Sequence, residues 1–128
     1  MRLPFAELIG LTFEEVKEGT SLCTLPVRDE LFNPQHVVHG GASYALADSG
    51  MGAALTSLLQ EGEYCATIEI KISYFKPVTT GTLTCKTVVI NKGKRVASLE
   101  SEIWNEGRLV AKASGSFAIF APSRRSPV

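Results

Sequence analysis

The stretch HGGASYALADSGMGAALTSLLQ, residues 39–60, decides the fold of this chain. It is rich in alanine and leucine, and Glu61-Gly62 follows it as a stop signal, so we predict one long helix from Gly41 to Gln60. Its apolar side chains do not form a single stripe when they are placed at about 100° per residue, which is typical of a helix covered on most sides. We therefore expect this helix to be the spine of the core.

The segments before the helix predict a helical turn, a hairpin and a loop. Residues 3–9 can form a short helical turn, and residues 11–28 hold two β-like runs broken at Glu18-Gly19. The stretch from Asp29 to Val38 contains Pro34 and loses the alternation, so we interpret it as a loop that leads into the helix.

The segments after the helix predict an antiparallel sheet. Four β-like runs cover roughly residues 64–75, 81–91, 94–104 and 108–120. In the first, Ile68, Ile70, Ile72 and Tyr74 alternate with polar residues, which predicts one apolar face with Thr67 on the polar face. Turn sequences at 91–94 and 105–107 make the last three runs a meander. The expected architecture is α+β: an antiparallel sheet wrapped around one central helix, in a single domain of residues 1–128 with a loose tail at 121–128.

Composition excludes several classes of function. Thirteen basic and thirteen acidic residues give a formal net charge of zero, so no basic surface for nucleic acid or an anionic membrane is expected. No stretch approaches the roughly 20 apolar residues of a membrane span, and the amino terminus lacks a secretory signal. Cys23, Cys65 and Cys85 are far apart, without metal-binding spacing, and are expected to be small core residues in a reducing compartment. We expect a cytoplasmic protein.

Asp48 is the charged residue that stands out, because it is the only one between Gly41 and Gln60. No lysine or arginine lies three or four positions away to neutralise it. Desolvating an unpaired carboxylate costs several kcal/mol, so such a residue needs a hydrogen-bonded partner or a use. A structural role, with backbone donors at a sheet edge, is one explanation. A general base or nucleophile is the one we favour.

The helix start is a second candidate site. The free N–H groups of a first helical turn can bind a developing oxyanion, and Gly40 and Gly41 allow close approach to the backbone. A purely steric reason for the two glycines is the alternative. His39 is expected to cap or orient this turn, while Asn33 either shapes the turn before Pro34 or holds water or a carbonyl through its amide. His36, His39 and Asp48 do not reproduce a metal-ligand motif, so no metal is expected.

The chain resembles the hotdog fold, and more specifically the phenylacetate-degradation-type (PaaI-like) thioesterases of that superfamily. The resemblance covers about residues 7–120. It is carried by Asn33, by His39-Gly40-Gly41, by Asp48 in a helix of small residues, by Thr67, and by the strand that ends in SYFKP at residues 73–77.

The resemblance implies an acyl-CoA thioesterase with a defined set of roles. Gly40 N–H would polarise the thioester carbonyl, Asn33 would help to place water or substrate, and Asp48 would activate water or attack directly. Thr67 occupies a position where the family often has a hydroxyl that assists the water. The aspartate and the glycine of one site come from different subunits in this family, which implies a homodimer that often pairs again as a tetramer. No cofactor is implied, because coenzyme A is part of the substrate.

Two other functions share this fold. Enoyl-CoA hydratases carry an Asn-Pro-x-His run, which Asn33-Pro34-Gln35-His36 resembles, but Leu31 and Val38 stand where that pattern calls for acidic residues. A non-catalytic module that binds acyl thioesters is the other alternative, although such a module is usually joined to a second domain. The preferred acyl group, and the choice between base and nucleophile for Asp48, stay open.

Overall fold

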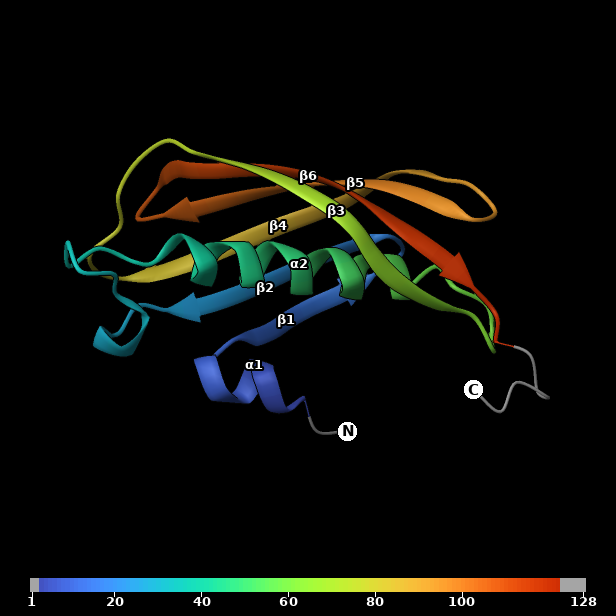
Figure 1. Ribbon diagram of the computed structural model, residues 1–128, viewed down its shortest axis with the longest axis horizontal. Helices are drawn as coiled ribbons and strands as arrows, with labels where there is room; N and C mark the ends of the chain where they lie inside the picture. The colour runs from blue at the N-terminus through green and yellow to red at the C-terminus, as the bar shows by residue number, and fades with distance from the viewer. Residues whose placement is uncertain (1–2, 123–128) are drawn as a thin grey trace.

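A computed structural model describes residues 3–122 and shows one long helix wrapped by a six-stranded antiparallel sheet (Figure 1). The strands lie in the order β1-β2-β4-β5-β6-β3. The elements are α1 (Pro4–Ile9), β1 (Thr12–Lys17), β2 (Thr20–Pro26), a 3-10 turn (Asp29–Leu31), α2 (Gly40–Thr56), β3 (Tyr64–Tyr74), β4 (Thr82–Lys92), β5 (Val96–Asn105) and β6 (Arg108–Phe120). The α+β class and the hotdog arrangement are therefore confirmed.

Most element predictions agree with the structure. The β1–β2 hairpin turns at Glu18 and Gly19, which have φ of 50° and 82°, and the β5–β6 hairpin turns at Glu106 and Gly107, with φ of 51° and 78°. Paired positive φ values match the right-handed twist of the flanking strands, which is why such turns select glycine at one position. The β4-β5-β6 meander is confirmed. Most of the tail predicted to be loose, residues 123–128, lies outside the described residues.

The predicted end of the long helix is wrong by four residues. The helix ends at Thr56 rather than Gln60, and Ser57 supplies the reason. The Ser57 hydroxyl donates to the Ala54 carbonyl and accepts from the Gly19 N–H, each at 2.7 Å. Leu58 N–H and Leu59 N–H then bond three residues back, which tightens the chain out of the α-helix.

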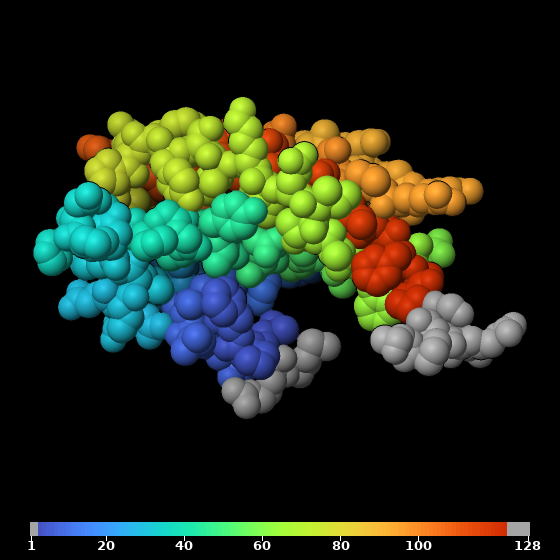
Figure 2. All heavy atoms as spheres, in the orientation of Figure 1, coloured from blue at the N-terminus to red at the C-terminus, as the bar shows by residue number. Residues whose placement is uncertain are grey.

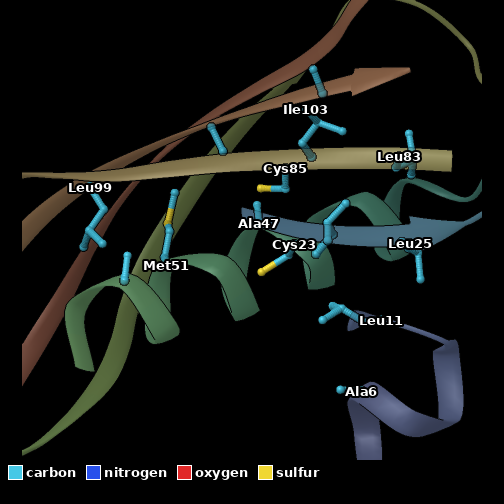
Figure 3. Close-up of a cluster of buried hydrophobic side chains, with 14 of the residues drawn as sticks. Ala6, Leu11, Cys23, Leu25, Ala47, Met51, Leu83, Cys85, Leu99 and Ile103 are labelled. Carbon is cyan, nitrogen blue, oxygen red and sulfur yellow. The ribbon is translucent and has the colours of Figure 1, made fainter. Parts of the chain in front are cut away.

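The core lies between α2 and the concave face of the sheet (Figure 3). The largest fully buried side chains include Leu46, Met51 and Leu55 of the helix, with Leu25, Leu83, Leu99 and Ile103 of the sheet. Cys23 and Cys85 face each other across β2 and β4, with no exposed area, as free thiols. Burial, with a smaller contribution from Cys85, raises the pKa of Cys23 to about 12. The prediction of core cysteines is confirmed for these two, whereas Cys65 is half-buried.

A buried seam of hydroxyl groups fixes the helix on the sheet. Ser21 Oγ donates to the Gly50 carbonyl oxygen at 2.7 Å, and the hydroxyls of Thr87 and Ser101 bond each other at 2.7 Å. A Cβ added at Gly50 would lie 2.9 Å from Thr87 Oγ1, closer than real Cβ contacts come. The helix can approach β2 and β4 this closely only because residue 50 has no side chain.

The wrapping sheet leaves one side of α2 uncovered. β1 and β3 are the two edges of the sheet, each paired with a single neighbour. In Figure 2 the middle of α2 is visible between β3 above it and α1 below it. No helix among residues 3–122 has the length and apolar character needed to cross a membrane.

Candidate active site

Asp48 and Thr67 form a hydrogen-bonded pair on the uncovered side of α2. Thr67 Oγ1 donates to Asp48 Oδ1 at 2.6 Å, and the aspartate is half-buried. Within the described residues this is the one hydrogen bond to the carboxylate, and no backbone donor binds it. The one ion pair in the described part of the chain joins Lys17 to Glu15, so no basic side chain neutralises Asp48. The structure therefore does not support the alternative in which Asp48 has a structural role and binds backbone donors at a sheet edge.

A β-bulge in β3 turns Thr67 toward the helix, and this overturns the predicted strand face. The pairing of β3 with β6 shifts register between Thr67 and Glu69, which leaves Ile68 as the extra residue, 54% exposed. One inserted residue exchanges the two faces of a strand. Thr67 therefore lies on the same face as the half-buried Ile70 and Ile72 and not on an outer polar face.

The start of α2 presents a free N–H at Gly40. His39 Nδ1 accepts the Gly41 N–H at 2.7 Å and the His39 carbonyl accepts the Ala42 N–H at 2.9 Å, so the histidine caps the helix as expected. The Gly40 N–H has no partner among the described residues. It lies at the positive end of the helix dipole, where an oxyanion is stabilised.

Steric demands on both glycines are also confirmed. A Cβ at Gly41 would meet His39 Nδ1 at 2.9 Å, and a Cβ at Gly40 would meet the Tyr74 hydroxyl oxygen at 3.1 Å. The steric explanation therefore applies at this turn, and the functional one stays a prediction.

Tyr74 positions the start of α2, a role that the sequence alone does not assign to it. Its hydroxyl donates to the Gly40 carbonyl at 2.5 Å and ties the helix start to the end of β3. Burial, with a smaller contribution from Tyr44, raises the pKa of the Tyr74 hydroxyl, so it stays protonated as a donor. Nothing in one sequence shows that a tyrosine at residue 74 reaches residue 40.

Asn33 shapes its own loop and also borders a cleft. Its Oδ1 accepts the Gln35 N–H at 2.9 Å, which is the turn-forming role considered for it, while its amide nitrogen has no partner among the described residues. Asn33, Gly40, Ser43 and Tyr74 are among the residues that line a cleft of about 310 Å³. His39 lies outside this cleft and borders a different hollow.

The five predicted site residues thus fall into two separate groups. Asn33, His39 and Gly40 gather at the helix start, and Asp48 and Thr67 pair further along. Eight residues separate Gly40 from Asp48, which is about 12 Å of helical rise. Within one chain, the free N–H and the carboxylate do not converge on one carbonyl group.

Comparison with known proteins identifies the family to which this chain belongs. A family model described as the thioesterase superfamily matches residues 35–112, which is more than half of the chain and contains the helix start, Asp48 and Thr67. The chain belongs to the thioesterase superfamily. This membership assigns it to the thioester hydrolases as a class.

Two solved structures share the fold of this thioesterase-superfamily chain, and a third protein is related to it in sequence. A conserved protein of Pseudomonas aeruginosa is 34% identical with a TM-score of 0.90, over 94% of this chain and 96% of the other. A mutant of the phenylacetic acid degradation protein PaaI of Thermus thermophilus is 27% identical with a TM-score of 0.84, over 91% and 98% of the two chains. The proofreading thioesterase EntH of Klebsiella pneumoniae is 24% identical over 98 residues, 77% of this chain and 72% of its own.

Proposed function

We propose that this protein hydrolyses acyl-coenzyme A thioesters to a carboxylic acid and free coenzyme A. The observation that carries the proposal is the Asp48 carboxylate, held by Thr67 at 2.6 Å, without a cation, on the uncovered side of the helix. Membership of the thioesterase superfamily supports thioester hydrolysis as the reaction. Coenzyme A enters as part of the substrate, and the reaction calls for no resident metal or cofactor.

The chemistry follows from two groups. In the general-base route, Asp48 takes a proton from water while the water oxygen bonds to the thioester carbon, and the Gly40 N–H stabilises the oxyanion that forms. Collapse of this intermediate breaks the C–S bond, and the proton passes to the departing thiolate. In the nucleophilic route, a carboxylate oxygen displaces the thiolate first, and water then cleaves the resulting anhydride. Thr67 orients the carboxylate in both routes.

Two copies of the chain complete the proposed site. The axial distance of about 12 Å between Gly40 and Asp48 supports an arrangement in which each carbonyl is bound by the helix start of one chain and the carboxylate of another. β3 is an edge strand beside Asp48, and an edge with unpaired backbone groups can pair with the same edge of a second copy. Large apolar side chains on and just after this strand are exposed, namely Tyr64, Ile68, Tyr74 and Phe75. We therefore propose a homodimer, with a tetramer as its further assembly.

The central test is Asp48→Asn, which keeps the shape of the side chain and removes its basicity. Hydrolysis of acyl-CoA, followed by the release of free thiol, should fall by about 10²- to 10⁴-fold because positioned acid–base catalysis contributes that much. Glu100→Gln, the same chemical change at an exposed site on β5, is the matched control and should keep the parent rate. An Asp48→Asn protein that hydrolyses acyl-CoA at the parent rate contradicts the mechanism.

Mixing variants tests the shared site. Asp48→Asn and Asn33→Ala chains are each expected to have little activity. After subunit exchange of an equal mixture, half of the dimers are mixed and each has one intact site, so about a quarter of the parent activity should return. No recovery, with exchange confirmed by mass spectrometry, would place both residues in one chain's site.

A further inference from the structure

An apolar groove with a cavity volume of about 840 Å³ runs along the uncovered side of α2. α1 and β1 form one wall and the second half of α2 forms the other. The lining residues include Phe5, Phe13 and Val16 on the first wall, with Ser49, Gly52 and Ala53 on the second. None of the residues that line the groove carries a charge. Its volume lies in the upper part of the roughly 300–1,000 Å³ typical of ligand pockets.

We propose that this groove binds the acyl group, so that the substrates are thioesters of uncharged, hydrophobic acids large enough to extend along it. The inference rests on the proposed function, since it gives that site its substrate class. It also gives Gly52 and Ala53 a role in substrate specificity that the sequence does not show.

The groove begins beside Asp48, which does not itself line it. Ser49 follows Asp48 directly, and Gly52 lies one helical turn beyond it, about 5 to 6 Å along the axis. The Asp48 carboxylate is hydrogen-bonded to β3, while the groove lies between α2 and α1 on the other side of the helix. A thioester carbonyl held at Asp48 can therefore direct its acyl group into the groove.

Packing among the described residues of one chain does not require glycine at residue 52. A Cβ at this position would find one described neighbour within 4 Å, Phe117 Cε2 at 3.9 Å, an ordinary contact. Its φ is not positive, and glycine inside a helix costs about 1 kcal/mol relative to alanine. Gly50, two residues earlier, is required by close packing instead. The absence of a side chain at Gly52 leaves open space along the α2 wall of the groove.

The polar groups of the groove do not suit a charged acyl group. Ser57 Oγ already donates to one backbone group and accepts from another, and Thr56 Oγ1 lies 3.7 Å from Cys65 Sγ. Ser49 is left as the hydroxyl without a partner among the described residues. A carboxylate carried into this groove would be desolvated with no cation and, among the lining side chains, only the Ser49 hydroxyl as a free donor, whereas apolar carbon gains from burial there.

A series of acyl-CoA substrates tests the proposal. From acetyl-CoA to octanoyl-CoA, kcat/KM should rise roughly three- to fourfold for each methylene that enters the groove, and at least about 100-fold in total. Succinyl-CoA, which ends in a carboxylate, should be hydrolysed no better than acetyl-CoA. A flat profile, or a preference for succinyl-CoA, would overturn the inference.

A matched pair of helix variants locates the effect. Ala53→Leu fills the groove, whereas Ala45→Leu makes the same change at another half-buried alanine of α2 outside it. Ala53→Leu should lower the octanoyl-to-acetyl ratio of kcat/KM at least tenfold, and Ala45→Leu should leave that ratio unchanged. If both ratios stay at the parent value, the acyl group binds elsewhere. If Ala53→Leu changes the oligomeric state by sedimentation while the ratio is kept, the groove is a contact between copies of the chain.

Equilibrium binding separates this inference from the proposed function. In the Asp48→Asn background, calorimetry should show octanoyl-CoA binding at least tenfold more tightly than acetyl-CoA, and Ala53→Leu should remove the difference. This measurement needs no turnover. A parent protein that hydrolyses no thioester refutes the proposed function alone, whereas equal affinities for the two thioesters refute the groove assignment alone.

Discussion

Replacing Gly50 with alanine is expected to destabilise the protein, whereas the same replacement at Gly52 is expected to stabilise it. Both glycines lie inside α2, so alanine brings the same gain in helix propensity, about 1 kcal/mol, at each. The two positions differ in what the new methyl group meets. At Gly52 the nearest described atom is 3.9 Å away, so the gain should appear in full.

At Gly50 the methyl group would lie 2.9 Å from Thr87 Oγ1, and the threonine side chain cannot move aside to relieve this contact. Thr87 is 3% exposed and its hydroxyl is fixed by Ser101 at 2.7 Å, while Ser21 holds the Gly50 carbonyl from the same side. Overpacking of a core costs about 1–3 kcal/mol, and this rigid seam places the cost in the upper half of that range. After the propensity gain, Gly50→Ala should be less stable than the parent by about 1–2 kcal/mol.

Chemical denaturation at equal subunit concentration measures both variants, because the stability of an oligomer depends on its concentration. The free energies of unfolding of the two variants should differ by about 2–3 kcal/mol. For a chain of this size, each kcal/mol corresponds to about 3–5 °C in Tm, so thermal unfolding should separate the two variants by roughly 6–15 °C. Thr87→Ala in the Gly50→Ala background removes the contacted oxygen, and the pair should be less destabilised than the sum of the single changes. Equal stability of the Gly50→Ala and Gly52→Ala proteins would refute this account of the seam.

Three further predictions concern the hydrogen bond to Asp48 and the thiols. Thr67→Val should lower kcat about tenfold or more while Thr67→Ser keeps most of it, because a hydrogen bond to a charged group is worth about 1.5–3 kcal/mol; equal loss in both would assign the effect to shape. At pH 8, a maleimide should label Cys65 in the native protein, as seen by mass spectrometry, and should reach Cys23 and Cys85 only after unfolding. Since burial raises the pKa of Cys23 from 9.0 to about 12, the free energy of unfolding should be unaffected by this thiol below pH 9 and should decrease between pH 9 and 12, where the unfolded thiol ionises first. A constant free energy of unfolding across that range would contradict the burial of the thiol.

The elements of the fold could be predicted because each depends on local patterns. Strand alternation, glycine-containing turns and a long run of helix-forming residues placed the six strands and both helices within a few residues. The helix end was missed because Ser57 bonds to Gly19, a contact between residues 38 positions apart. A one-dimensional pattern contains no information about such a partner.

The face of β3 was missed for a different reason. Ile68, Ile70, Ile72 and Tyr74 alternate so regularly that the sequence favours one continuous apolar face, with Thr67 outside it. The bulge places Ile68 outside the regular pairing and moves Thr67 to the helix side. The pairing of β3 with β6 determines where this bulge lies. Thr67 was proposed as a site residue from the family resemblance, while alternation alone placed it on the wrong face.

The two groups of site residues connect catalysis to assembly in the proposed dimer. α2 carries the proposed oxyanion donor at its first residue and the proposed catalytic carboxylate eight residues later, and a straight helix cannot bend the two toward one carbonyl. β3, which holds Thr67 against Asp48 and Tyr74 against Gly40, is also one of the two edges of the sheet. The strand that positions both proposed catalytic groups within the chain is thus an edge strand that can pair with a second copy. A substitution that weakens pairing of this edge should therefore lower kcat/KM in parallel with the dimer fraction, even where it touches neither Asp48 nor Gly40.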